Sequence, residues 1–196
     1  VRTMLVSAPE NPSNTLGWIF AILAQEPEHD ARILEEMRQV LGDRDPEEKD
    51  LPKMEFALRF IQEVLRLYPG AWIMDRWSLK QDMVMGHPMP ADKMIIMSPY
   101  IAHRNPQFWP DPLRFDPDRF LPEVAQDRPA HHYIPFGAGP RMCIGYKMAL
   151  MELQVMLPVL LRRLRFEITS PRPVQKSAQI TLRPRGLRFK VTSRSW

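Results

Sequence analysis

The chain has 196 residues, of which 44% are apolar and 26% are charged, a balance that excludes a disordered chain and predicts a globular fold with a sizeable core. Its single cysteine, Cys143, excludes an internal disulfide, so nothing indicates an oxidising compartment and a reducing cytoplasm fits better. The net charge is +4, from 27 basic and 23 acidic residues.

The first elements along the chain are helical. The longest apolar run, LGWIFAILA at 16–24, is shorter than the roughly 20 residues that a membrane-spanning helix needs. The first residues of the sequence, VRTMLVSAPE, lack the layout and the cleavage site expected of a signal peptide. Apolar stripes with a helical period predict one helix over residues 27–42 and another over 52–69. A third helix is predicted from about residue 144 to residue 166, with a kink at Pro158.

The segments between and after these helices differ from them in composition. Residues 69–135 hold most of the 21 prolines, with short β-like runs such as MIIM at 94–97, which is unusual in a compact domain unless the segment wraps something. Residues 179–191 alternate and predict a small hairpin around Arg185-Gly186. Basic residues gather at 162–165 and 183–190, which indicates either a solvated face or a docking patch for an acidic protein; without stacking aromatics, no nucleic-acid partner is predicted.

The stretch FGAGPRMCIG at 136–145 holds the only cysteine and three of the eight glycines. A lone cysteine beside glycines can be a buried structural residue. It can also be a thiolate that the backbone must bring close to a flat cofactor, for which glycine is the suitable neighbour. The pattern is F-x-x-G-x-R-x-C-x-G, carried by Phe136, Gly137, Gly139, Arg141, Cys143 and Gly145.

This pattern resembles the haem-binding loop of the cytochrome P450 family, whose haem iron has a cysteine thiolate ligand. The resemblance implies haem (iron protoporphyrin) as cofactor, with Cys143 as the iron ligand and Arg141 as a partner of a haem propionate. The third predicted helix begins just after Cys143, and its positive end favours a negative charge on the sulfur. Taken alone, Arg141 could be a simple surface charge.

Two further motifs extend the resemblance. Glu63 and Arg66 in QEVLRLYP are three residues apart and so share one helix face, where they can pair. Arg119 in WPDPLRFDPDRF resembles the third member of the family's Glu-Arg-Arg network. In the family these residues are structural and hold the core around the haem loop, so no chemistry is assigned to them.

Other positions are implied by the same resemblance. Arg76 falls where many members carry a second propionate-binding arginine, although solvation alone would also explain it, and His103 in AHRNP is another commonly matched position. Two segments resemble those that reach the substrate pocket and are apolar or neutral, which favours an apolar substrate. They comprise Ala71, Trp72 and Ile73 up to Met74, and Ala178 with Gln179.

The resemblance places the family's long distal helix in the first 25 residues, where members show A/G-G-x-D/E-T. Aligning on NTLGW at 14–18 puts Ser7-Ala8-Pro9-Glu10-Asn11 on that motif. The acid is retained as Glu10, whereas Asn11 replaces the threonine that, with the acid, helps deliver protons to dioxygen in the family. An amide relays protons less well than a hydroxyl, but Asn11 can still donate a hydrogen bond or hold a water.

The same alignment predicts other changes in this helix. Ala8 replaces a glycine, and Pro9 and Pro12 are expected to interrupt the helix. Thr15 lies one turn after Asn11, but treating it as the missing alcohol would break the match at Trp18. Dioxygen activation could thus be impaired, rerouted through water or replaced by peroxide, or the helix could simply be divergent with unchanged chemistry.

The fold class expected is mainly α with small β-sheets. Residues 1–196 would form the haem-ligating C-terminal half of the cytochrome P450 fold, and a complementary N-terminal half would be a separate or missing chain, so that the protein works as a heterodimer or split subunit. Without that half, a large apolar face would be exposed. The sequence leaves open a membrane anchor in the absent part.

The function expected is a haem-thiolate monooxygenase that inserts an oxygen atom from O2 into an apolar small molecule. Its electrons would come from a ferredoxin-like or flavin reductase partner, because no flavin or nicotinamide motif is present. Two alternatives stay open. One is a peroxide-using or rearranging haem enzyme, motivated by Asn11, and the other is a non-catalytic subunit that binds a partner and no haem.

Overall fold

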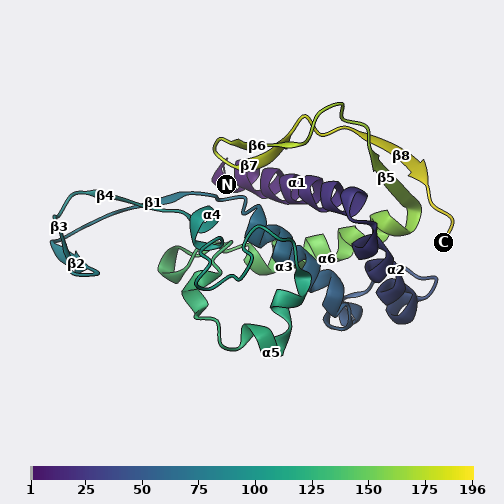
Figure 1. The fold of residues 1–196 in the computed structure, drawn as a ribbon, viewed down its shortest axis with the longest axis horizontal. Helices are drawn as coiled ribbons and strands as arrows, with labels where there is room; N and C mark the ends of the chain where they lie inside the picture. Colours follow the sequence, from purple (N-terminus) through teal and green to yellow (C-terminus); the bar gives the residue numbers. More distant parts are fainter. Residues whose placement is uncertain (1) are drawn as a thin grey trace.

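The computed structural model describes residues 2–196, with side chains from residue 9 onward. In this described part of the chain, four long helices form the body, and short helices and two-stranded sheets surround it (Figure 1). The long helices are α1 (Arg2–Gln25), α2 (Pro27–Leu41), α3 (Glu55–Leu67) and α6 (Tyr146–Arg163). The expected fold class, mainly α with small β-sheets, is confirmed.

The hydrophobic core lies where these four helices meet. Each of the helices α1, α2 and α3 contacts α6, and α1 also contacts α2 and α3. The stripe predicted over residues 27–42 is buried as expected, and so is most of α3. The side chains of the core that are less than 1% exposed include Ile19, Ile33, Met37, Met54, Ala57, Phe60, Ile61, Val64 and Leu157.

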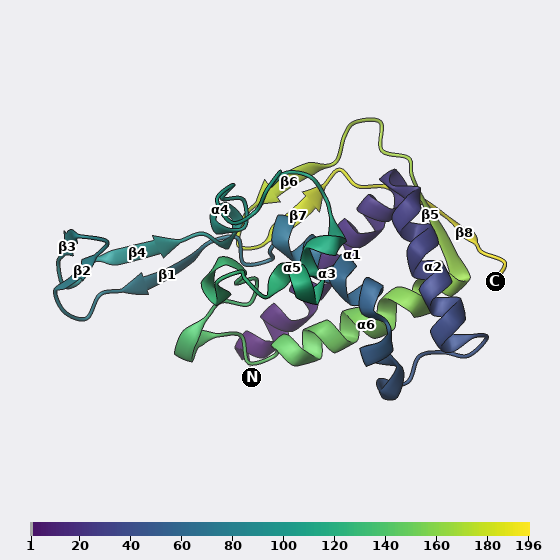
Figure 2. The same cartoon turned by 60° about the horizontal axis from the view of Figure 1, so that its bottom comes forward.

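Within residues 2–196, the strands pair in four separate two-stranded antiparallel sheets. The pairs are β1 (Met74–Trp77) with β4 (Met94–Met97), β2 (Asp82–Val84) with β3 (His87–Met89), β5 (Leu164–Ile168) with β8 (Phe189–Ser193), and β6 (Gln175–Ala178) with β7 (Leu182–Arg185). The first two pairs form an arm that projects from the helical body, and the β6–β7 pair lies along α1 (Figures 1 and 2).

Short helices occupy the proline-rich segment and its surroundings. They are η1 (Glu48–Lys53), α4 (Pro99–Ala102), η2 (Pro117–Phe120), α5 (Pro122–Ala125), η3 (Ala130–His132) and η4 (Gly139–Arg141). Proline stands at the first or second position of α4, η2, α5 and η4, where its missing N–H leaves no helical bond unmade. The run MIIM is strand β4, as predicted.

Three expectations about local structure are wrong. Pro9 and Pro12 do not interrupt α1, which continues through both. The hydroxyls of Ser13 and Thr15 donate to the carbonyl oxygens of Pro9 and Asn11, at 2.7 and 2.9 Å, and the second half of the helix is packed in the core. Tertiary packing therefore outweighs the local cost of the two prolines.

The predicted hairpin at 179–191 is also wrong. Strand β7 pairs with β6 and turns at residues 179–181, whereas β8 pairs with β5, which comes directly after α6. Alternation shows that a segment is a strand but does not show which strand it pairs with. The third helix ends at Arg163 rather than near residue 166, because the residues from Leu164 onward pair with β8. Pro158 lies inside this helix, and the kink expected there stays a prediction.

No helix among residues 2–196 combines the length and the apolar character needed to cross a membrane.

Candidate haem-binding site

The cysteine loop is held by turns of its own backbone. The N–H of Cys143 donates to the carbonyl of Phe136 at 2.9 Å, and the N–H of Gly137 donates to Ile134 at 3.0 Å. Gly137 and Gly139 have φ of +76° and +70°, in the left-handed region that favours glycine. These two glycines let the chain fold back sharply, so that Cys143 is presented between this turn and the start of α6.

The thiol of Cys143 is free and exposed. It lies three residues before the first residue of α6, whose positive end favours negative charge nearby. A Cβ added to Gly145 would come 4.0 Å from the sulfur, so glycine keeps that side of the sulfur open. Two apolar residues that follow it in the sequence are exposed as well, with Ile144 95% and Met148 66% accessible. An exposed cysteine sulfur beside exposed apolar side chains suits a flat, apolar macrocycle whose metal takes a sulfur ligand.

Arg141 is exposed in η4, and no ion pair is found for it within the described part of the chain. Arg76 is half-buried in β1 and donates to the carbonyl of Asp75 at 2.7 Å. Met74 lies on the same face of this strand as Arg76, and its Cε would be 3.8 Å from a Cβ added at Gly137. Strand β1, which carries Arg76, therefore runs beside the loop that carries Arg141 and Cys143.

Phe136, the first residue of the motif, packs inward. It is partly buried against the hydrophobic core, and its ring centre lies 6.2 Å from that of Tyr146, the first residue of α6. Phe136 thus anchors the loop on the core while its carbonyl receives the N–H of Cys143.

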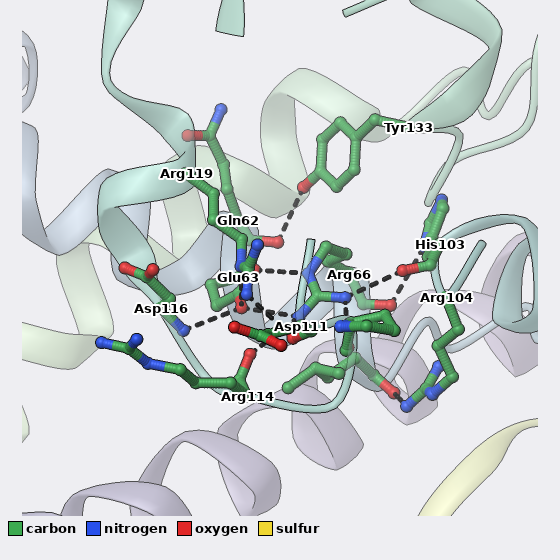
Figure 3. Close-up of polar contacts among 12 residues, drawn as sticks. Gln62, Glu63, Arg66, His103, Arg104, Asp111, Arg114, Asp116, Arg119 and Tyr133 are labelled. Atoms are coloured by element: carbon green, nitrogen blue, oxygen red, sulfur yellow. Dashed lines mark hydrogen bonds and ion pairs between the residues drawn. The ribbon is translucent and has the colours of Figure 1, made fainter. Parts of the chain in front are cut away.

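The structure brings Glu63, Arg66 and Arg119 together in a buried polar network (Figure 3). Nε and Nη2 of Arg66 donate to the carboxylate of Glu63 at 2.6 and 2.7 Å. Nη1 of Arg66 donates to the carbonyls of His103 and Pro112, both at 2.8 Å. Nη2 also donates to the carbonyl of Arg114 at 3.1 Å. All five guanidinium N–H groups of the fully buried Arg66 therefore have acceptors.

The carboxylate of Glu63 is equally well held. The N–H of Asp116 donates to Glu63 Oε1 at 2.9 Å, and Nε of Arg119 lies 3.6 Å from the same oxygen. Arg119 Nη2 also donates to the carbonyl of Asp111 at 2.9 Å. Burial raises the pKa of Glu63, while Arg66, the N–H of Asp116 and Arg119 act in the opposite direction. This network joins α3 to the segment around η2.

His103 connects this network to the cysteine loop. Its Nε2 accepts the N–H of Ile134 at 2.8 Å, so the ring hydrogen stands on Nδ1, which lies 3.0 Å from the carbonyl of Arg66 and donates to it. His103 is fully buried, and desolvation lowers its pKa to about 4. A neutral imidazole thus bridges the end of α3 and the segment that leads into the motif at Phe136.

Glu10 and Asn11 point toward the C-terminal tail and the loop after α3. The hydroxyl of Thr181 donates to Glu10 Oε1 at 2.6 Å. The side chain of Asn11 packs on Gly70, since a Cβ added there would lie 2.5 Å from Asn11 Oδ1. The side chains of Ser7 and Ala8, which begin the aligned motif, lie outside the described residues.

The two predicted substrate segments meet in space. Nε1 of Trp72 donates to the carbonyl of Gln179 at 2.8 Å, although 107 positions separate these residues. Ala71, Ile73 and Ala178 are exposed near this junction. Two neighbours, the 91% exposed Ile180 and the buried Thr181, are not recognisable from the sequence, because only the pairing of β6 with β7 shows that they form the tip of a turn.

The basic run at 162–165 is partly neutralised within the chain. Asp45 accepts from Nη2 of Arg163 at 2.9 Å and lies 3.5 Å from Nη1 of Arg162. Arg165 lies 3.7 Å from Glu167. The surface is therefore less positive than the sequence suggests.

The family model described as cytochrome P450 matches residues 1–191. The chain belongs to the cytochrome P450 family. It is 35% identical to pentalenene oxygenase of Streptomyces avermitilis over its whole length, which covers 44% of that protein. It is 37% identical over 84% of its length to cyclooctat-9-en-7-ol 5-monooxygenase of Streptomyces melanosporofaciens (36% of that protein), and 35% identical over 99% to cytochrome P450 4c3 of Drosophila melanogaster (37% of that protein).

Members of the cytochrome P450 family use haem as cofactor, so the resemblance stated from the motif is confirmed at the level of the family. The chain spans about two fifths of the length of the curated relatives it matches.

Proposed function

We propose that this chain is the haem-ligating part of a cytochrome P450 monooxygenase, with Cys143 as the iron ligand. The observation that carries the proposal is the exposed thiol of Cys143, held between the Gly137–Gly139 turn and the N-terminus of α6. When bound, haem supplies the redox-active iron needed to insert an oxygen atom from O2 into an organic substrate. Arg141 and Arg76 would bind its propionates, since guanidinium groups pair well with carboxylates.

The chain's own residues have three tasks in this reaction. The cysteine loop presents the thiolate, and its anchoring through Phe136 and His103 keeps the sulfur in one place. Glu10 is the acid that would accept and donate protons on the α1 side of the site. Asn11 orients a hydrogen bond or a water there but transfers protons less well than the hydroxyl it replaces.

The substrate proposed is an apolar small molecule. Ala71, Ile73, Ala178 and Ile180 offer exposed apolar surface where the loop before β1 meets the β6–β7 turn. The names of two relatives refer to pentalenene and cyclooctat-9-en-7-ol, which supports a substrate of this kind.

The site needs a further wall, which we propose is a polypeptide equivalent to the N-terminal part of the fold, whether on the same chain or a separate one. Met148 and Met151 lie three residues apart on α6 and are 66% and 44% exposed. Ile144, just before this helix, is 95% exposed, so the three side chains are exposed as a surface that another segment covers would be. Electrons would come from a ferredoxin-like or flavin reductase. Residues 1–196 would then form one unit of the fold, working in the cytoplasm.

An absorption spectrum tests the proposal. The purified protein, with any polypeptide that completes it, is reduced and exposed to carbon monoxide. A strongly red-shifted Soret band that Cys143→Ala abolishes is expected for a thiolate ligand. Haem-free protein that retains folding and partner binding in Cys143→Ala would instead indicate a non-catalytic subunit.

A peroxide-using enzyme is the second candidate, and Asn11 is the observation that favours it. Hydrogen peroxide already contains the two electrons and two protons that O2 must gain. A reaction with peroxide therefore depends less on proton transfer by the residue at position 11. Turnover of a substrate with hydrogen peroxide, and none with O2 and a reductase, would support this candidate over the monooxygenase.

A further inference from the structure

The turn between β6 and β7 is fastened to α1 and to the loop after α3. The N–H of Leu182 donates to the carbonyl of Gly70 at 3.0 Å, and the indole of Trp18 donates to the carbonyl of Leu182 at 3.3 Å. Thr181 lies at the centre of these contacts and is 7% exposed. The turn is therefore a fixed part of the site, although more than 160 positions separate it from α1 in the sequence.

The hydroxyl of Thr181 links two residues of α1. It donates to Glu10 Oε1 at 2.6 Å and accepts from Nδ2 of Asn14 at 3.1 Å. Glu10 and Asn14 are four residues apart and so lie one above the other on one face of the helix. A short hydrogen bond to a carboxylate is among the stronger polar contacts in a protein, and partial burial strengthens it further.

This hydroxyl stands beside the acid on a helix that lacks the family's threonine at position 11. Ala8, Asn11 and Pro12 carry no hydroxyl, and the hydroxyls of Ser13 and Thr15 donate to backbone carbonyls of the same helix. Within the side chains that the structure describes, Thr181 alone donates a hydroxyl hydrogen to Glu10.

We propose that Thr181 is the positioning residue for Glu10. Through its hydrogen bonds to Asn14 and Glu10, it would couple proton supply by the acid on α1 to the position of the turn between β6 and β7. This inference rests on the proposed function, since it assumes that Glu10 serves the reduction of dioxygen. The hydroxyl of Thr181, in the C-terminal tail, would fix the rotamer of Glu10. It would be the hydroxyl next to the acid, because the residue at position 11 has none.

The share of hydrogen peroxide released during reduction of O2 can be measured without the substrate and without the redox partner. Reduction of O2 to hydrogen peroxide consumes two electrons and two protons, whereas reduction to two waters consumes four of each. A haem site with a well-placed acid completes the second process more often. Released peroxide therefore rises when Glu10 is no longer held.

The first measurement concerns the hydrogen bond itself and does not depend on haem. Infrared difference spectra of the full protein compare wild type with Thr181→Val, each with and without Glu10→Gln. We expect a shift of a carboxylate band that disappears in the Glu10→Gln background. Thr181→Ser keeps the hydroxyl and should restore the wild-type band. Absence of any Glu10-dependent shift would overturn the proposal.

The second measurement uses the haem-loaded protein on a rotating ring-disc electrode, which supplies electrons at the disc and detects hydrogen peroxide at the ring. Thr181→Val should raise the released share of peroxide about threefold, and Thr181→Ser should restore it. Thr192→Val, in β8, is the matched control and should leave it unchanged. Equal peroxide release from wild type and Thr181→Val would contradict the inference.

The two measurements separate failure of the inference from failure of the proposed function. If the protein binds no haem but the infrared shift is present, the hydrogen bond stands and the proton-supply role is refuted together with the monooxygenase proposal. If haem binds through Cys143 and neither measurement responds to Thr181→Val, the proposed function stands and the role of Thr181 is refuted.

Discussion

Two glutamates of the chain, Glu63 and Glu10, are the centres of two hydrogen-bonded groups that differ in the kind of partner each acid has. Glu63 is fully buried and is held by two arginines and one backbone N–H, and every N–H of its partner Arg66 is used. Glu10 is half-buried and receives a hydroxyl, and no cation pairs with it within the described residues. The first arrangement locks the Glu63 side chain in place from several sides, whereas the second holds the Glu10 side chain through the hydroxyl of Thr181. The two arginine partners suit the structural role expected for Glu63, whereas proton supply by Glu10 is the role that we propose.

The largest effect is expected from breaking the locked centre. Arg66→Ala leaves the buried carboxylate of Glu63 without its main partner and frees three backbone carbonyls. The free energy of unfolding should fall by about 3–5 kcal/mol, measured by chemical denaturation. Arg188→Ala, at an exposed arginine, is the matched control and should change it by less than about 0.5 kcal/mol. A similar small change for Arg66→Ala would mean that the network does not hold the core.

The next effect concerns His103, which joins the locked centre to the cysteine loop. Its pKa is about 4 in the folded protein against 6.5 as the ordinary value, so the unfolded chain binds the proton more readily. Stability from this group is therefore complete above pH 6.5 and is lost as the pH falls toward 4, by roughly 3 kcal/mol in total. The charged groups facing the ring, Arg66 and Arg104, act in the same direction as burial.

The measurement is the free energy of unfolding between pH 7 and 4, in wild type and in His103→Gln. The variant should lose less stability over this range, whereas His87→Gln, at an exposed histidine in β3, should follow the wild-type curve. Parallel curves for wild type and His103→Gln would show that His103 is not a buried neutral residue.

A smaller effect is expected at the contact between α1 and the loop after α3. In Gly70→Ala the new methyl group would meet Asn11 Oδ1 at 2.5 Å, which is too close for any real Cβ contact. Because the nearest atom is the end of a side chain that can shift, the free energy of unfolding should fall by about 1 kcal/mol, at the lower end of the usual cost of overpacking. Asn11→Ala in the same chain should recover most of this loss, because it removes the colliding atoms. Additive effects of the two changes would mean that Asn11 and Gly70 do not touch.

The difference between the two centres also explains what the sequence could predict. Glu63 and Arg66 are three residues apart on one helix, so their pairing follows from helix geometry and the motif. Thr181 meets Glu10 across 171 positions, and no local pattern carries that contact. The same limit explains the hairpin error, because β7 and β8 have partners elsewhere in the chain, and the proline error, because core packing of α1 is a tertiary effect.

The smallest effect on stability is expected at the basic run, where the exposed pairing of Arg163 with Asp45 tests whether this surface serves docking. Both side chains are 53% exposed, so Arg163→Ala should change the free energy of unfolding by less than about 1 kcal/mol, and added salt should reduce the change.

If an acidic reductase docks here, Asp45→Asn should speed reduction of the haem at low salt, because it frees Arg162 and Arg163 for the partner. Reversal of the charges from Arg162 to Arg165 should slow it. Reduction rates that respond to neither change would place the docking surface elsewhere and leave the two arginines as ties between α6 and the loop after α2.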